Sequence, residues 1–139
     1  MKVLIINGPN LNLLSKRNPS IYGDVSFDKY FKQLSVLFSE VSLTYYQSNI
    51  EGEIIDKLQL SESKFDFIVL NAGGYSHTSV AIADCIEAIS NPVIEVHISN
   101  IYARESFRHK SLISSFCVGV ITGLGLDVYR LAIENIINR

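Results

Sequence analysis

The sequence has few cysteines, no long apolar run and no excess of basic charge. Its two cysteines, Cys85 and Cys117, lack a CxxC spacing, which favours buried free thiols over a disulfide or a metal pair. The first apolar run stops at Asn7, too soon for a signal peptide or a membrane span. The 12 basic and 14 acidic residues are interspersed and give a net charge of −2, with no basic stripe to bind nucleic acid. We therefore expect a cytoplasmic protein whose partners are neither nucleic acid nor membrane.

The chain also lacks a Pro/Gly/Ser-rich linker that could divide it into two parts. With 139 residues and 47% hydrophobic content it is large enough to bury one core but too short for two. We expect residues 1–139 to form a single catalytic domain.

Short β-branched and aliphatic runs alternate with segments of helical periodicity. This alternation predicts an α/β fold, with a parallel sheet covered by helices on both faces. We expect a doubly wound, flavodoxin-like sheet of five strands in the order 2-1-3-4-5, with each strand buried on both faces. The predicted strands are 3–6, 41–45, 67–70, 93–96 and 116–121, and the predicted helices are 27–38, behind Ser26 as a cap, 51–60, 79–89 and 124–137.

Polar and glycine-rich segments follow four of the predicted strands. Ligands of open parallel sheets bind beyond the carboxyl ends of the strands, near the point where strand order reverses. The site is therefore predicted at this edge of the sheet. The segments are Asn7-Gly8-Pro9-Asn10, Asn71-Ala72-Gly73-Gly74, His97-Ile98-Ser99-Asn100 and Thr122-Gly123-Leu124-Gly125.

The first of these connections, from Gly8 to about Val25, is long and carries Arg17 and Tyr22. Long loops without regular structure are commonly lids or binding loops. A nearby guanidinium favours the ionised form of a tyrosine, so Tyr22 could ionise more readily than a free tyrosine. The alternative is a tyrosine that only packs on the surface.

His97 ends a predicted strand, and Glu95 lies two residues earlier on the same face of the sheet. An imidazole there could act as a general acid or base, and the glutamate could orient it or raise its pKa. The alternative is a purely structural histidine. His77 and Asp84 are seven residues apart, and share a helical face if the helix begins near His77; a helix cap plus a solvent-facing residue is the alternative.

Other side chains at this edge suit ligand binding, although familiar motifs are missing. Asn71 precedes two glycines whose backbone could approach a ligand, and Arg108 could bind a carboxylate or could lie on the surface. The sequence has no phosphate loop, no complete dinucleotide fingerprint and no GxSxG motif. A metal site is conceivable but lacks HxxxH or HxH spacing; its ligands would be His77, Asp84, Glu95 and His97.

Several blocks of the chain resemble the type II 3-dehydroquinate dehydratases of the shikimate pathway. The resemblance covers essentially the whole chain. Its departures are Ser15, Tyr102 and Ser106, where the family commonly has glycine, histidine and proline. The matching blocks are Asn7-Gly8-Pro9-Asn10-Leu11-Asn12-Leu13-Leu14, Arg17 with Ile21-Tyr22-Gly23, Gln47-Ser48-Asn49 with Glu51-Gly52-Glu53, Asn71-Ala72-Gly73 with His77-Thr78-Ser79, and Glu95-Val96-His97-Ile98-Ser99-Asn100.

The resemblance implies a lyase that removes water from 3-dehydroquinate by anti elimination through an enolate, reversibly and without a cofactor. It implies that Tyr22 takes the C2 proton, that Arg17 on a mobile lid favours tyrosinate, and that His97 protonates the departing hydroxyl. It also implies that Glu95 is paired with His97 and that Asn10 positions a water molecule near the enolate oxygen. The implied assembly is a homododecamer, a tetramer of trimers, in which Asp84 reaches a neighbouring site. The implied substrate contacts are Asn71, His77, Ile98, Ser99 and Arg108.

Alternatives of other classes remain open at this point. A noncatalytic module could bind a small ligand or a nucleotide in the same crevice. The second alternative is a metal-dependent hydrolase. Dehydration of the same substrate through a lysine Schiff base is a third route, but no lysine is an obvious buried amine at a strand end.

Overall fold

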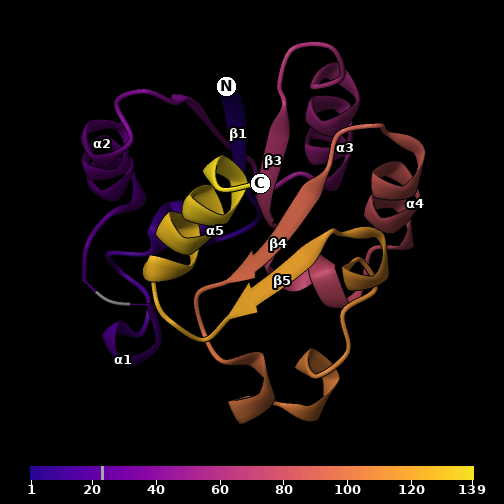
Figure 1. Cartoon of the computed structure of the whole chain (residues 1–139). Coiled ribbons are helices and arrows are strands. Elements are labelled where there is room, and N and C mark those ends of the chain that lie inside the picture. Colours follow the sequence, from indigo (N-terminus) through magenta and orange to yellow (C-terminus); the bar gives the residue numbers. More distant parts are fainter. Residues whose placement is uncertain (23) are drawn as a thin grey trace.

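The chain forms a parallel sheet with helices on both faces (Figure 1). The computed structural model describes residues 1–22 and 24–139, without the side chain of Tyr22. The strand order β2-β1-β3-β4-β5 and the parallel pairing confirm the predicted flavodoxin-like topology. The strands are β1 (Lys2–Asn7), β2 (Ser42–Gln47), β3 (Phe67–Asn71), β4 (Val93–His97) and β5 (Gly119–Thr122).

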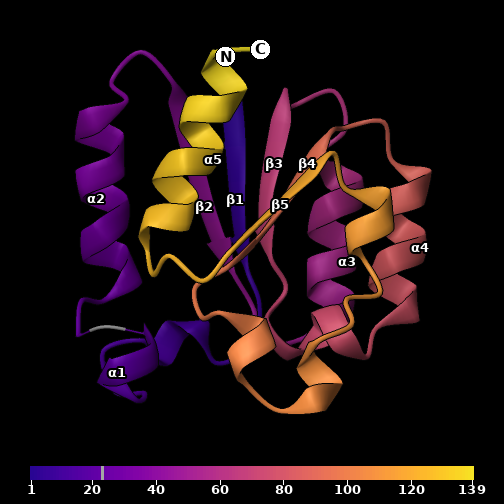
Figure 2. The same ribbon diagram turned by 60° about the horizontal axis from the view of Figure 1, so that its bottom comes forward.

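Helices α2 and α5 cover one face of the sheet, and α3 and α4 cover the other (Figure 2). Ser26 caps α2 as predicted, because its Oγ accepts a hydrogen bond from the Lys29 backbone N–H at 3.3 Å. The helices are α1 (Pro19–Tyr22), α2 (Phe27–Leu37), α3 (Glu51–Leu60), α4 (Val80–Ala88) and α5 (Asp127–Ile137). Short 3₁₀ helices are η1 (Leu11–Leu13), η2 (Gly73–His77), η3 (Ile101–Ala103), η4 (Ser106–Arg108) and η5 (Ser114–Phe116).

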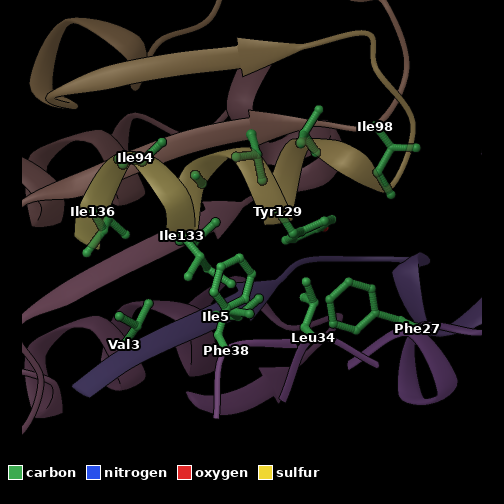
Figure 3. Close-up of a cluster of buried hydrophobic side chains, with 14 of the residues drawn as sticks. Val3, Ile5, Phe27, Leu34, Phe38, Ile94, Ile98, Tyr129, Ile133 and Ile136 are labelled. Carbon is green, nitrogen blue, oxygen red and sulfur yellow. The ribbon is translucent and has the colours of Figure 1, made fainter. Parts of the chain in front are cut away.

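Strand β1 contributes to both hydrophobic cores, because successive side chains of a strand point to opposite faces. Val3 and Ile5 pack in the core under α2 and α5, and the residues after each of them pack against α3 and α4. Figure 3 shows the first core, in which the rings of Tyr129 and Phe27 lie 4.8 Å apart between centroids. This contact joins α5, which carries Tyr129, to the first turn of α2 on the same face of the sheet.

Two expectations about the strands were wrong in detail. Strand β5 begins at Gly119 instead of Phe116, because the preceding residues form η5 and the Cys117 N–H bonds the Ser114 carbonyl at 3.1 Å. The edge strands β2 and β5 are also partly exposed, whereas burial on both faces was expected. Edge strands have a neighbour on one side only, so a hydrophobic run does not guarantee full burial there.

The connections differ from expectation as well. The segment between β1 and α2 was expected to be structureless, but it contains η1 and α1. Helix α4 begins at Val80, where the Ser79 Oγ accepts from the Ile82 N–H at 2.9 Å. His77 therefore precedes the helix in η2 and does not share a helical face with Asp84.

A buried hydrogen-bond network ties α5 to the ends of β1 and β3. The Tyr129 hydroxyl donates to Asn7 Oδ1 at 2.7 Å and accepts from Asn71 Nδ2 at 2.9 Å. The Asn71 Oδ1 in turn accepts from the Gly73 N–H at 3.2 Å. The helix thus orients Asn71, one of the predicted site residues, from beneath.

We expect Tyr129→Phe to lower the free energy of unfolding by about 1–3 kcal/mol, because the substitution leaves buried amide groups without their partner. Guanidinium unfolding would measure this loss. Tyr102→Phe is the matched control: that side chain is 62% exposed, and its loss of a hydroxyl should change stability by less than about 0.5 kcal/mol. Equal stability of the two variants would contradict the structural role of the network.

Candidate active site

A cavity of about 120 Å³ opens at the carboxyl edge of the sheet, where the sequence placed the site. It brings together eight predicted site residues from the ends of β3 and β4 and from the three connections that follow β1, β3 and β4. These are Asn10, Arg17, Asn71, His77, His97, Ile98, Ser99 and Arg108. The lining also includes Pro9, Leu11, Gly73, Gly74, Ile101 and Arg104.

One wall of the cavity depends on close backbone contact between the first and third connections. The Gly8 N–H donates to the Asn71 carbonyl at 2.7 Å. A Cβ atom at Gly8 would lie 2.5 Å from the Ala72 carbonyl oxygen, closer than van der Waals contact allows. Glycine is therefore required at this position by the neighbouring backbone.

We expect Gly8→Ala to destabilise the protein by about 1–3 kcal/mol, because backbone must move to relieve the clash. Gly52→Ala provides a control of opposite sign. Position 52 lies in α3 and has no atom within 4 Å of an added Cβ, so alanine should stabilise by about 0.4–1 kcal/mol. Thermal and denaturant unfolding of both variants would test the pair, and a neutral Gly8→Ala would contradict the packing argument.

Asn10 has a left-handed backbone conformation, with φ of 68°. Its N–H donates to Asn49 Oδ1 at 3.0 Å, and the same oxygen accepts from Gln47 Nε2 at 3.1 Å. Gln47 Nε2 also donates to the Gly8 carbonyl at 3.2 Å. Side chains at the end of β2 and just after it thus fix the backbone that carries Asn10 into the cavity.

His97 and Glu95 form a buried pair at the end of β4. His97 Nε2 lies 2.5 Å from Glu95 Oε1, as the two-residue spacing along the strand predicts. The Glu95 side chain is fully buried and lies beneath the cavity lining. Burial raises the pKa of Glu95, but hydrogen bonds from His97, Ser114 and Ser111 outweigh burial and leave that pKa below its usual value. Glu95 is therefore a carboxylate at neutral pH.

His77 stacks against His97, with ring centroids 5.9 Å apart, but has a different environment. Burial lowers the pKa of His77, and the neighbouring His97 lowers it further, against the opposing effect of the hydrogen bond that the ring donates to the Lys110 carbonyl. Its Nδ1 lies 2.8 Å from the Lys110 carbonyl oxygen, which can only accept. His77 is therefore neutral at neutral pH, with the proton on Nδ1 and a hydrogen-bond acceptor at Nε2.

Three arginines line the cavity: Arg17, Arg104 and Arg108. Arg108 Nε lies 2.6 Å from Glu105 Oε2, and Arg104 Nη1 donates to Ser99 Oγ at 3.3 Å. Guanidinium groups bind carboxylates through paired donors, so the cavity is suited to an anionic ligand. Arg104 was not predicted as a site residue, although its place four residues before Arg108 in the same polar segment was a usable signal.

Of the three other predicted site residues, two have described side chains and neither lines the cavity: Glu95 lies beneath it, and Asp84 lies elsewhere. The side chain of Tyr22 lies outside the described residues; the backbone of Tyr22 ends α1. Asp84 is exposed on α4 and is absent from the cavity lining. Within the described part of the chain, no group of three or more His, Cys, Asp or Glu side chains is placed to hold a metal ion.

The model of the family "Dehydroquinase class II" matches residues 1–137. The chain belongs to the class II dehydroquinase family. A 3-dehydroquinate dehydratase of an Exiguobacterium species is 52% identical over 140 residues, which cover 99% of this chain and 94% of that protein. One from Campylobacter jejuni is 50% identical over 139 residues, covering 99% and 87%. The crystal structure of the type II dehydroquinase from Butyrivibrio crossotus superimposes with a TM-score of 0.95 at 43% identity, covering 100% of this chain and 98% of that one.

Proposed function

We propose that this chain is a type II 3-dehydroquinate dehydratase of the shikimate pathway. It removes water from 3-dehydroquinate by anti elimination to give 3-dehydroshikimate, reversibly and without a cofactor. Membership of the class II dehydroquinase family supports the reaction. The observation that carries the assignment to this cavity is the contact between His97 and the buried carboxylate of Glu95, beside three arginines.

The substrate carries a carboxylate, a ketone and several hydroxyl groups, and the cavity offers a partner for each kind of group. The arginines supply donors for the carboxylate. The acceptor at His77 Nε2 suits a substrate hydroxyl, and the Asn71 side chain and the Ser99 hydroxyl suit others. Asn10 would hold a water molecule near the enolate oxygen, where negative charge develops in the transition state.

Elimination requires a base at C2 and an acid at the C1 hydroxyl. Tyrosinate at Tyr22 takes the C2 proton, favoured by the Arg17 guanidinium, and the electron pair forms the enolate. Collapse of the enolate breaks the C1–O bond, and His97 supplies the proton with which hydroxide leaves as water. The Glu95 carboxylate stabilises the imidazolium form of His97 from which that proton comes.

Ultraviolet absorbance tests this proposal, because the product is a conjugated enone and the substrate is not. The purified protein should raise the absorbance of a 3-dehydroquinate solution and keep its activity after dialysis against a chelator. Substrate binding without any absorbance change would favour a noncatalytic binding module instead. Borohydride added with substrate should leave the protein mass unchanged, and a mass gain would indicate the lysine Schiff-base route.

We also propose that the active form is a homododecamer in which Asp84 contributes to a neighbouring cavity. The exposed position of Asp84 on α4 and the exposed apolar side chains Val36 and Leu37 on α2 support subunit contacts. Sedimentation and light scattering would measure the subunit number.

A cytoplasmic location is proposed as well, and the free thiols of Cys85 and Cys117 suit a reducing compartment. No helix in the described ranges is both long and apolar enough to cross a membrane.

A further inference from the structure

The segment from Lys110 to Ser114 contacts the surroundings of both cavity histidines. The Lys110 carbonyl accepts from His77 Nδ1, and the Leu112 N–H donates to the Ser76 carbonyl at 2.8 Å. These bonds hold the segment against η2. The same segment then passes over the end of β4, where Glu95 lies.

Two serines of this segment complete the hydrogen bonding of the buried glutamate. Ser111 Oγ donates to Glu95 Oε1 at 2.7 Å, on the oxygen that also contacts His97 Nε2. Ser114 Oγ donates to the other oxygen, Oε2. The Ser111 oxygen also accepts from the Ile113 N–H at 3.3 Å, which directs its hydroxyl proton toward Glu95. Three donors therefore surround a carboxylate that is fully buried.

We propose that Ser111 and Ser114 are positioning residues, which keep Glu95 ionised in the protein interior and thereby maintain the anionic partner that His97 Nε2 contacts. A buried carboxylate without donors takes up a proton, because the interior solvates its charge poorly. If Glu95 were neutral, His97 Nε2 would lose its anionic partner. The proposal rests on the proposed function only in that His97 acts there as the acid; the ionisation itself is independent of any reaction.

Few other groups in the described structure act on this pair electrostatically. His77 stacks on His97 and is itself kept neutral, and Arg108 lies near enough to His77 to lower its pKa further. On the opposite side, burial and the charge of Glu95 raise the pKa of the Cys117 thiol to about 12, so the thiol stays neutral. The pairing strands β3 and β5 place the apolar residues Leu70 and Val120 beside Glu95. Substitution of the two serines can therefore change the environment of Glu95 without removing a charged group.

The direction of the pH effect is set by the protonation state of Glu95 to which the serines donate. They donate to the ionised carboxylate, so removing them favours its protonation and raises the pH at which Glu95 takes up a proton. A hydrogen bond to a charged group corresponds to a shift of about one to two pH units for each serine. The acid-side limb of the turnover profile should move in the same direction, with little change in KM.

Infrared difference spectroscopy on the ligand-free protein tests this directly. The band of a protonated carboxylic acid, assigned to Glu95 by its absence from Glu95→Gln, should appear at higher pH in Ser111→Ala, in Ser114→Ala and most of all in the double variant. Ser114→Thr retains a hydroxyl and should restore the original titration. Ser35→Ala is the matched control, because that hydroxyl donates at 2.9 Å to the Phe31 carbonyl in α2, away from the cavity.

An unchanged band and an unchanged acid limb in the folded double variant would overturn the proposal and leave the serines a packing role. A shifted band in a protein without dehydratase activity would sustain the role of the serines and reject the proposed function. Dehydratase activity in the wild type, together with an unshifted band in the double variant, would sustain the proposed function and reject the role of the serines. The two proposals can therefore fail separately.

Discussion

Replacing Tyr22 with phenylalanine should lower the turnover number by about 10²–10⁴-fold, the usual contribution of a positioned general base. Phenylalanine keeps the ring but cannot carry the negative charge that takes up the C2 proton. Substrate binding, measured by calorimetry, should be retained because the arginines and amides of the cavity remain. Exchange of the C2 proton with deuterated solvent should also stop, since exchange needs the same base.

Tyr46→Phe is the control for this prediction. Tyr46 lies on β2 at a half-buried position, with the Lys57 ammonium 5.1 Å from its ring centre. It also loses a hydroxyl, yet it lies outside the cavity lining and should leave turnover unchanged. If Tyr22→Phe kept near-normal turnover or exchange, another group would be the base and the proposed role would be wrong.

His97→Asn should reduce dehydration by about 10²–10⁴-fold while allowing C2 exchange to continue. Asparagine removes the titrating imidazole that delivers a proton to the departing hydroxyl, but it leaves the base at C2 in place. The enolate then forms and returns to substrate, so deuterium should accumulate at C2 without product. Mass spectrometry of recovered substrate, combined with the absorbance assay, measures both rates.

His109→Asn serves as the matched control, because His109 is exposed and does not line the cavity; its Nε2 contacts the Arg104 carbonyl at 3.1 Å, and its ring centre lies 6.0 Å from that of Tyr102. It should retain both activities. Loss of exchange together with dehydration in a folded His97→Asn protein would show that proton removal and hydroxide departure do not occur in separate steps. Loss of both dehydration and exchange in Tyr22→Phe, with exchange retained in His97→Asn, would assign the base and the acid to these residues.

The sequence predicted the sheet order and the edge that carries the cavity, because both follow from periodicity and strand connectivity. The burial of Glu95 and its contact with His97 followed from the two-residue repeat of a strand. These features depend on local patterns that every residue of the element repeats. The particular reaction came instead from the resemblance of several motif blocks, since cavity geometry alone fits more than one small anionic ligand.

Other parts of the site had no such local pattern. Ser111 and Ser114 meet Glu95 across 16 and 19 residues of sequence, through a segment whose course depends on η4 and η5. Arg104 enters the cavity from a similar irregular segment. Short 3₁₀ turns have no repeating hydrophobic signal, so the direction of their side chains is set by tertiary contacts. The role proposed for Asp84 involves a neighbouring subunit, which no pattern within a single chain specifies.

The bond between His77 Nδ1 and the Lys110 carbonyl makes the imidazole selective toward inhibitors. A ligand that places an ether oxygen or a carbonyl against Nε2 brings lone pair against lone pair, whereas an alcohol or an amine at the same position gains a bond. The ring thus discriminates between compounds of equal size by whether one group donates or accepts a hydrogen bond. Medicinal chemistry on this cavity should keep a donor at that point and vary the scaffold elsewhere.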